Sequence, residues 1–177
     1  MKLYNTDNKV VFEAPVHTEW ELVKAALEAK VDFRYIDLEG YDLFGLKVQD
    51  VDFTGANLIS SNCTGCTFNG CTFNGAELDH VNLTDAHFYA CKFEKCNMGY
   101  MNATFTAFRN CYFDSPYWTC ALIRQAYFER CTIYAARVYE TAIIRTEFKD
   151  CRILNTSWKG AVQHLNCFTE EVQYDYL

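Results

Sequence analysis

Residues 66–80 read CTFNG CTFNG AELDH, three consecutive blocks of five residues that share one pattern. Each block begins with a small residue, continues with a polar residue and then a large apolar one, and ends with two further residues that include Asn-Gly pairs. The pattern has neither the 3.6-residue period of an amphipathic helix nor the alternation of a long strand. Two inward positions separated by one outward residue instead predict very short strands, with turns between them.

The same five-residue frame extends from about Val31 to Gly160. Its central column, counted from Phe33 to Trp158, has 26 positions, of which 24 are large and apolar and two are Cys63 and Ala103. Two residues earlier lies a column of mostly small residues, in which Ala and Cys predominate. A repeat this short and regular predicts a solenoid, in which each coil packs on the next.

Sorting the central column by twenty residues separates it into four sides, which we name after their first residues. The Phe33 side reads Phe33, Phe53, Phe73, Phe93, Phe113, Ile133 and Ile153, and the Val48 side reads Val48, Phe68, Phe88, Phe108, Phe128 and Phe148. The Leu38 side reads Leu38, Leu58, Leu78, Met98, Trp118, Val138 and Trp158, and the Leu43 side reads Leu43, Cys63, Leu83, Ala103, Ile123 and Ile143. Two Phe ladders and two aliphatic ladders predict an all-β, right-handed, quadrilateral parallel β-helix with coils about 4.8 Å apart.

This repeat, Ala or Cys, a polar residue, Leu or Phe and two variable residues, resembles that of the pentapeptide-repeat proteins. The resemblance covers about 130 of the 177 residues and implies the same β-helix. Members of this family do different things, and a helix that leads into the repeats resembles phage-encoded members. Some relatives imitate DNA and bind gyrase, and members often dimerise through the C-terminal end.

Residues outside the frame predict a cap at each end. Thr18-Glu19-Trp20-Glu21 is a capping-box sequence, so residues 1–30 should contain a helix from Thr18 to about Lys30 after a short strand over Lys9–Phe12. We expect the helix to cover the first coil, with Trp20, Val23, Ala26 and Leu27 facing inward. Residues 31–160 form the β-helix, and residues 161–177 cap the last coil. The candidate dimer contact is formed by Phe168, Tyr174, Tyr176 and Leu177.

The cysteines and histidines indicate no catalytic, metal or cofactor site. Cys71, Cys91, Cys111, Cys131 and Cys151 are spaced by twenty and should stack inside the rod as small apolar filling. Cys63-x-x-Cys66 has the spacing of a zinc or redox motif, but both residues occupy inward positions. We therefore expect a protein that is not an enzyme and binds no cofactor.

Acidic residues make DNA mimicry a hypothesis to be weighed. The Leu38 side carries a candidate acidic surface formed by Asp37, Glu39, Glu77 and Asp79. Residues 31–160 nevertheless carry a net charge of only −3, and no charged residue lies between Asp52 and Glu77. A DNA duplex has one negative charge per roughly 1.7 Å, so this rod is a poor electrostatic copy.

Exposed tyrosines favour a protein partner. Tyr100, Tyr117 and Tyr139 occupy outward positions of the Leu38 side in three consecutive coils, and tyrosine is enriched at protein interfaces. The leading hypothesis is a protein-binding rod, a phage or bacterial accessory factor that inhibits or modulates a host protein. The alternatives are a DNA mimic that acts on gyrase or another DNA-binding enzyme, and a structural or assembly component.

The remaining expectations concern location and partners. The N-terminus lacks the basic and apolar regions of a signal peptide, and no apolar stretch approaches the length of a membrane span. We expect a cytoplasmic protein, in the host cytoplasm if it is phage-encoded, with reduced cysteines. The expected partner is a protein of unknown identity, with a homodimer as a candidate, and neither direct nucleic-acid binding nor membrane binding is expected; the formal net charge is −7.

Overall fold

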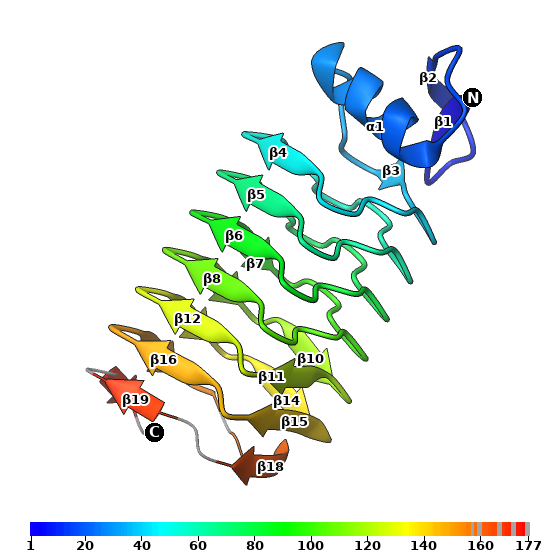
Figure 1. Cartoon of the computed structure of the whole chain (residues 1–177). Helices are drawn as coiled ribbons and strands as arrows, with labels where there is room; N and C mark the ends of the chain where they lie inside the picture. The colour runs from blue at the N-terminus through cyan, green and yellow to red at the C-terminus, as the bar shows by residue number, and fades with distance from the viewer. Residues whose placement is uncertain (157, 159–160, 166–167, 171–172, 176–177) are drawn as a thin grey trace.

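The computed structural model describes residues 1–156, 158, 161–165, 168–170 and 173–175. The chain forms a rod of stacked coils with a helix and a small antiparallel sheet at its N-terminal end (Figure 1). Parallel strands pair along the rod with an offset of twenty residues, for example Phe68 with Phe88 and Phe88 with Phe108. The predicted four-sided parallel β-helix is confirmed.

The strands of the Val48 and Phe33 sides form the two largest sheets. A seven-stranded sheet contains β4 (Lys47–Gln49), β5 (Thr67–Asn69), β6 (His87–Tyr89), β8 (Ala107–Arg109), β12 (Tyr127–Glu129), β16 (Glu147–Lys149) and β19 (Phe168–Glu170). A five-stranded sheet contains β7 (Lys92–Glu94), β9 (Tyr112–Asp114), β13 (Thr132–Tyr134), β17 (Arg152–Leu154) and β20 (Gln173–Asp175).

The other two sides combine short strands with isolated bridges. The Leu43 side contains β11 (Leu122–Arg124), β15 (Thr141–Ile144) and β18 (Ala161–Leu165). The Leu38 side contains β10 (Tyr117–Thr119) and β14 (Arg137–Tyr139). Single bridges at twenty-residue spacing, such as Asp37–Asn57 and Asn57–Glu77, continue both sides towards the N-terminus.

The core is the pair of Phe ladders predicted from the sequence. Rings one coil apart stack in parallel, with centroids 5.0 Å apart for Phe68–Phe88 and 5.1 Å for Phe73–Phe93. Rings of neighbouring sides meet edge to face, as Phe68 and Phe73 do at 5.3 Å. Both arrangements are favourable for aromatic rings, so the ladders stabilise the stack in addition to the burial of their area.

The N-terminal cap contains more structure than the sequence predicted. The helix α1 spans Glu19–Glu28, and Thr18 and Glu21 form the predicted capping box. Of the predicted inward stripe, Val23 and Ala26 are buried, whereas Trp20 and Leu27 are only half-buried at the rim of the first coil.

The sequence analysis missed one strand of the cap, β1 (Lys2–Asn5), which pairs with the edge of the first coil. The predicted strand is β2 (Val10–Glu13), and it pairs with β1. In turn β1 pairs antiparallel with β3 (Ile36–Asp37) and thereby covers the strand edge on the Leu38 side.

The C-terminal strands continue the sheets with a changed offset. Thr141 pairs with Ala161, but the next pair is Ala142 with Gln163, so one extra residue enters the coil. Beyond this bulge the offset is 21 residues, as for Glu147 with Phe168. Of the proposed dimer contact, Phe168 and Tyr174 lie on β19 and β20, whereas Tyr176 and Leu177 lie outside the described residues.

Candidate protein-contact surface

The three tyrosines predicted to face outward are all exposed on the Leu38 side. The exposed fractions are 52% for Tyr100, 37% for Tyr117 and 60% for Tyr139. Tyr117 lies on β10 and Tyr139 on β14, which pair directly, and Tyr100 lies in the coil before β10. The β-helix therefore gathers three large amphipathic side chains on one side.

Neighbouring coils hold these rings in place. The imidazole of His80 stacks on the ring of Tyr100 with centroids 4.6 Å apart, and the guanidinium of Arg137 lies 4.8 Å from the centroid of Tyr117. A hydrogen bond with the Glu140 carboxylate raises the pKa of Tyr139, and one with the Cys120 thiol raises the pKa of Tyr100. Tyr100 and Tyr139 are thus neutral hydrogen-bonding groups at physiological pH.

The candidate acidic surface lies on the same side, nearer the N-terminus. Asn57 Nδ2 donates to Asp37 Oδ1 at 3.0 Å and to Glu39 Oε2 at 3.1 Å. Asn97 Nδ2 donates to Glu77 Oε2 at 2.9 Å, and Asp79 Oδ2 lies 3.5 Å from His80 Nε2. Each carboxylate therefore has a polar neighbour within the rod, and the acidic and tyrosine surfaces form one continuous side.

The charge changes sign along the rod. Residues 31–95 contain ten Asp or Glu and four Lys or Arg, a net charge of −6. Residues 96–160 contain five Asp or Glu and eight Lys or Arg, a net charge of +3. Arginine follows the same division, because Arg34 is the one arginine of the first segment and six lie in the second. Tyrosine and arginine, both enriched at binding hot spots, thus concentrate in the C-terminal half.

The interior cysteines are packed as the sequence predicted. Cys71, Cys91, Cys111, Cys131 and Cys151 are all buried, and their thiols donate to main-chain carbonyls, as Cys131 does to Phe108 O at 3.3 Å. Burial raises the pKa of Cys111 and raises that of Cys96 to about 12, which keeps these thiols protonated. Cys63 and Cys66 are also buried. Within the described part of the chain, no group of three or more His, Cys, Asp or Glu residues is placed to hold a metal ion.

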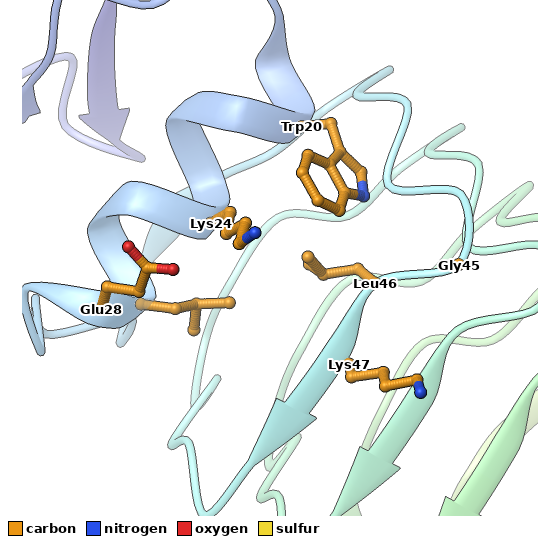
Figure 2. Close-up of a pocket in the computed structure, with 7 residues that line it drawn as sticks. Trp20, Lys24, Glu28, Gly45, Leu46 and Lys47 are labelled. Atoms are coloured by element: carbon orange, nitrogen blue, oxygen red, sulfur yellow. The ribbon is translucent and has the colours of Figure 1, made fainter.

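A cleft between α1 and the first coil was not predicted (Figure 2). Its volume is about 370 Å³, and it is lined by Trp20, Lys24, Leu27, Glu28, Gly45, Leu46 and Lys47. Trp20 Nε1 donates to Phe44 O at 3.1 Å, and the ammonium of Lys24 lies 5.1 Å from the centroid of the Trp20 ring. The lining combines the apolar Trp20, Leu27 and Leu46 with the charged Lys24, Glu28 and Lys47. No helix among the described residues is long and apolar enough to cross a membrane.

Comparison with known proteins agrees with this architecture. Residues 46–116 match the family described as pentapeptide repeat region. These residues form a pentapeptide repeat region. A search of curated proteins found no match.

Solved pentapeptide-repeat structures are similar at low identity. HetL from the cyanobacterium Nostoc sp. strain PCC 7120, which is involved in heterocyst differentiation regulation, has 12% identity and a TM-score of 0.37, over 88% of this chain and 80% of its own. A trypsin-treated form of QnrB1, a plasmid-mediated fluoroquinolone resistance protein, has 16% identity and a TM-score of 0.30, over 78% and 84%. These values carry no information on function.

The structure shows two ring contacts on the Leu38 side that the sequence analysis did not predict. The twenty-residue period places His80 beside Tyr100 and Tyr117 beside Arg137, so it contained the signal for both ring contacts. The cleft beside α1 had a weaker signal, the bulky Leu46 at a position where Ala or Cys is usual in this frame. Such a residue indicates that the first coil widens to meet another element.

Proposed function

We propose that this protein is a non-enzymatic protein-binding rod and that the Leu38 side is its contact surface. The observation that carries the proposal is the exposure of Tyr100, Tyr117 and Tyr139 in three consecutive coils. Tyrosine offers a large contact area with few rotatable bonds and a hydroxyl for hydrogen bonding, which suits it to binding surfaces. The exposed Arg137 places its guanidinium over the ring of Tyr117 and adds a charged anchor.

Backbone conformation at the corners is shared by all four sides. Tyr100, Cys120 and Glu140 occupy one corner column of the Leu38 side with φ of 51°, 52° and 50°. The left-handed region costs a residue with a Cβ about 1–2 kcal/mol. Because the same conformation recurs at the corner of every coil, it belongs to the repeat and does not by itself distinguish the Leu38 side.

Charge distribution makes DNA mimicry the weaker hypothesis. A mimic of a duplex needs carboxylates along its whole length, whereas residues 96–160 carry a net charge of +3. In the acidic half, Asp37, Glu39 and Glu77 accept hydrogen bonds from asparagine amides of the next coil. A supercoiling assay with gyrase at micromolar protein tests this alternative, and inhibition would revive it.

The proposal is tested by replacing Tyr100, Tyr117 and Tyr139 with Ala in one variant. Capture of partners from a lysate of the source organism, followed by quantitative mass spectrometry, should show the loss of a specific protein that the wild type retains. Because the three side chains are exposed, the thermal unfolding midpoint should change by no more than about 2 °C.

A variant of the Phe33 side provides the matched control. Tyr112 and Tyr134 are exposed to 37% and 38%, similar to Tyr117, so replacing both with Ala removes exposed tyrosine rings from another side. This control should retain the partner. Equal capture by the wild type and the triple variant, or loss only in the control, would exclude the Leu38 side as the contact surface.

A further inference from the structure

We propose that the cleft between α1 and the first coil binds a small amphipathic carboxylate, a ligand with an apolar body and one anionic head group. The cleft lies where the Leu43 side meets the Val48 side, since Gly45 and Leu46 line it from the corner between these sides. It is separate from the tyrosines of the Leu38 side, so the proposal does not depend on the proposed function.

The size of the cleft suits a small ligand. Its volume of about 370 Å³ lies within the range of about 300–1,000 Å³ that is usual for small-molecule sites. Because a water molecule occupies about 30 Å³ in the liquid, this volume corresponds to roughly a dozen non-hydrogen atoms. The expected ligand is therefore a short-chain or single-ring acid rather than a large cofactor.

Apolar side chains of two elements face each other across the cleft. Trp20 and Leu27 lie on α1, and Leu46 lies in the first coil (Figure 2). In the five later coils the position of Leu46 is occupied by the smaller Cys66, Ala86, Thr106, Ala126 and Thr146. Burial of the ligand's apolar body between Trp20 and Leu46 would favour binding.

The cleft is already formed in the protein without a ligand. Trp20 Nε1 donates to Phe44 O at 3.1 Å, which satisfies the polar atom of the indole and fixes the ring at the cleft. At Gly45 nothing lies within 4 Å of the place where a Cβ would be, so this wall leaves space open. A preformed site loses little conformational entropy when a ligand binds.

Two lysines make the cleft complementary to an anion. Lys24 lies on α1 and Lys47 on β4, so one ammonium comes from each wall. Among the described residues, neither ammonium forms an ion pair with a carboxylate, and that of Lys24 lies 5.1 Å from the centroid of the Trp20 ring. Both can therefore donate charge-assisted hydrogen bonds to an anionic head group.

Glu28 limits the charge of the ligand that fits. With Lys24 and Lys47 it gives the lining two cations and one anion, a net charge of +1. A head group with one negative charge balances this lining, whereas a dianion would leave excess negative charge near Glu28. A cationic ligand would instead be repelled by the two lysines. The charges thus select a monocarboxylate.

Titration with octanoate, followed by NMR of the full chain, tests the proposal. Octanamide is the neutral control ligand, since it has the same shape and no charge. The indole N–H signal of Trp20, assigned by its loss in Trp20→Phe, reports on the cleft. At about 50 mM salt octanoate should shift this signal with a dissociation constant of about 0.01–1 mM, and octanamide should bind at least about fivefold more weakly.

Variants separate binding in the cleft from nonspecific association. Replacing Lys24 and Lys47 together with Gln should weaken octanoate binding at least about tenfold and leave octanamide binding unchanged. Both side chains are exposed, so the variant should remain folded. Lys92→Gln is the matched control, because Lys92 is exposed on the Phe33 side, and it should bind octanoate as the wild type does.

The proposal would be overturned by the absence of a saturable shift of the Trp20 signal up to about 10 mM octanoate. Equal affinities for octanoate and octanamide would also overturn it, as would equal binding of octanoate by the double lysine variant and the Lys92→Gln control. Capture by the tyrosine variant tests the proposed function separately.

Discussion

The two halves of the rod share one core but differ at their corners. In residues 31–95 the corner residues include Gly40, Gly45, Gly55, Gly65, Gly70 and Gly75, and the turns of three sides are closed by main-chain bonds such as Ala56 N to Phe53 O at 3.0 Å. In residues 96–155 the same column continues with positive φ, yet every member has a side chain. Positive φ at the third residue of a turn normally selects glycine.

The difference shows that fold and surface are specified separately. The stacked Phe rings continue through both halves at nearly constant spacing, from 5.0 Å for Phe53–Phe73 to 4.9 Å for Phe128–Phe148. Six of the thirteen corners in residues 31–95 are glycines, which adopt this conformation at little cost, whereas every corner in residues 96–155 has a side chain, as Tyr100, Glu140 and Arg145 do. The half in which every corner has a side chain is also the half rich in tyrosine and arginine.

The largest expected effect tests whether the core is common to both halves. Phe68→Ala in the N-terminal half and Phe128→Ala in the C-terminal half should each lower the free energy of unfolding by about 3–5 kcal/mol, because each removes a buried ring. Urea unfolding followed by circular dichroism measures both. A loss below about 1 kcal/mol in one half alone would show that the halves have different cores.

A smaller effect on stability should distinguish a glycine corner from a corner that has a side chain. Gly65 has φ +66° and open space around its missing Cβ, so Gly65→Ala adds only backbone strain and should cost about 1 kcal/mol. Ala135 has φ 49°, and Ala135→Gly should stabilise the protein by up to about 1 kcal/mol because it removes the same strain. Thermal or urea unfolding compares the pair. If Ala135→Gly destabilised the protein as much as Gly65→Ala, the corner strain would not exist.

The smallest expected effect is a difference in reactivity between two thiols of the folded protein. It involves no change in stability. Cys120 is half-buried at a corner of the C-terminal half, whereas Cys96 is buried and burial raises its pKa to about 12. In a Cys167→Ser background, iodoacetamide at pH 8 should therefore alkylate Cys120 in the folded protein, and Cys96 should react only after unfolding. Peptide mass spectrometry reads both sites, and faster modification of Cys96 would contradict the packing of the interior column.

Most of the fold could be predicted from the repeat, because the same five-residue pattern specifies every coil. The inward columns, the Phe ladders and the capping box at Thr18 are visible in the sequence, since each depends on spacing alone. The pairing of β1 with β3 was not predictable in this way, because it joins segments about thirty residues apart that lie outside or at the edge of the frame. The 21-residue offset of the C-terminal strands likewise depends on a bulge that no local pattern marks.

The sequence predicted where the three tyrosines lie, but not which side chains contact them. The frame placed Tyr100, Tyr117 and Tyr139 outward on one side, and the structure confirms this. The neighbours of these rings depend on side-chain rotamers, which periodicity does not contain. The cleft beside α1 was missed for a related reason, since it depends on how the helix lies against Leu46 (Figure 2).

Site-specific photo-crosslinking tests the central claim most directly, namely that the Leu38 side is the protein-contact surface. Benzoylphenylalanine replaces Tyr139 in one variant and Tyr134, on the Phe33 side, in the other; both tyrosines are exposed, to 60% and 38%. The account predicts crosslinks to a partner protein from position 139 and none above background from position 134. Crosslinks from position 134 alone, or equal yields from both, would contradict it.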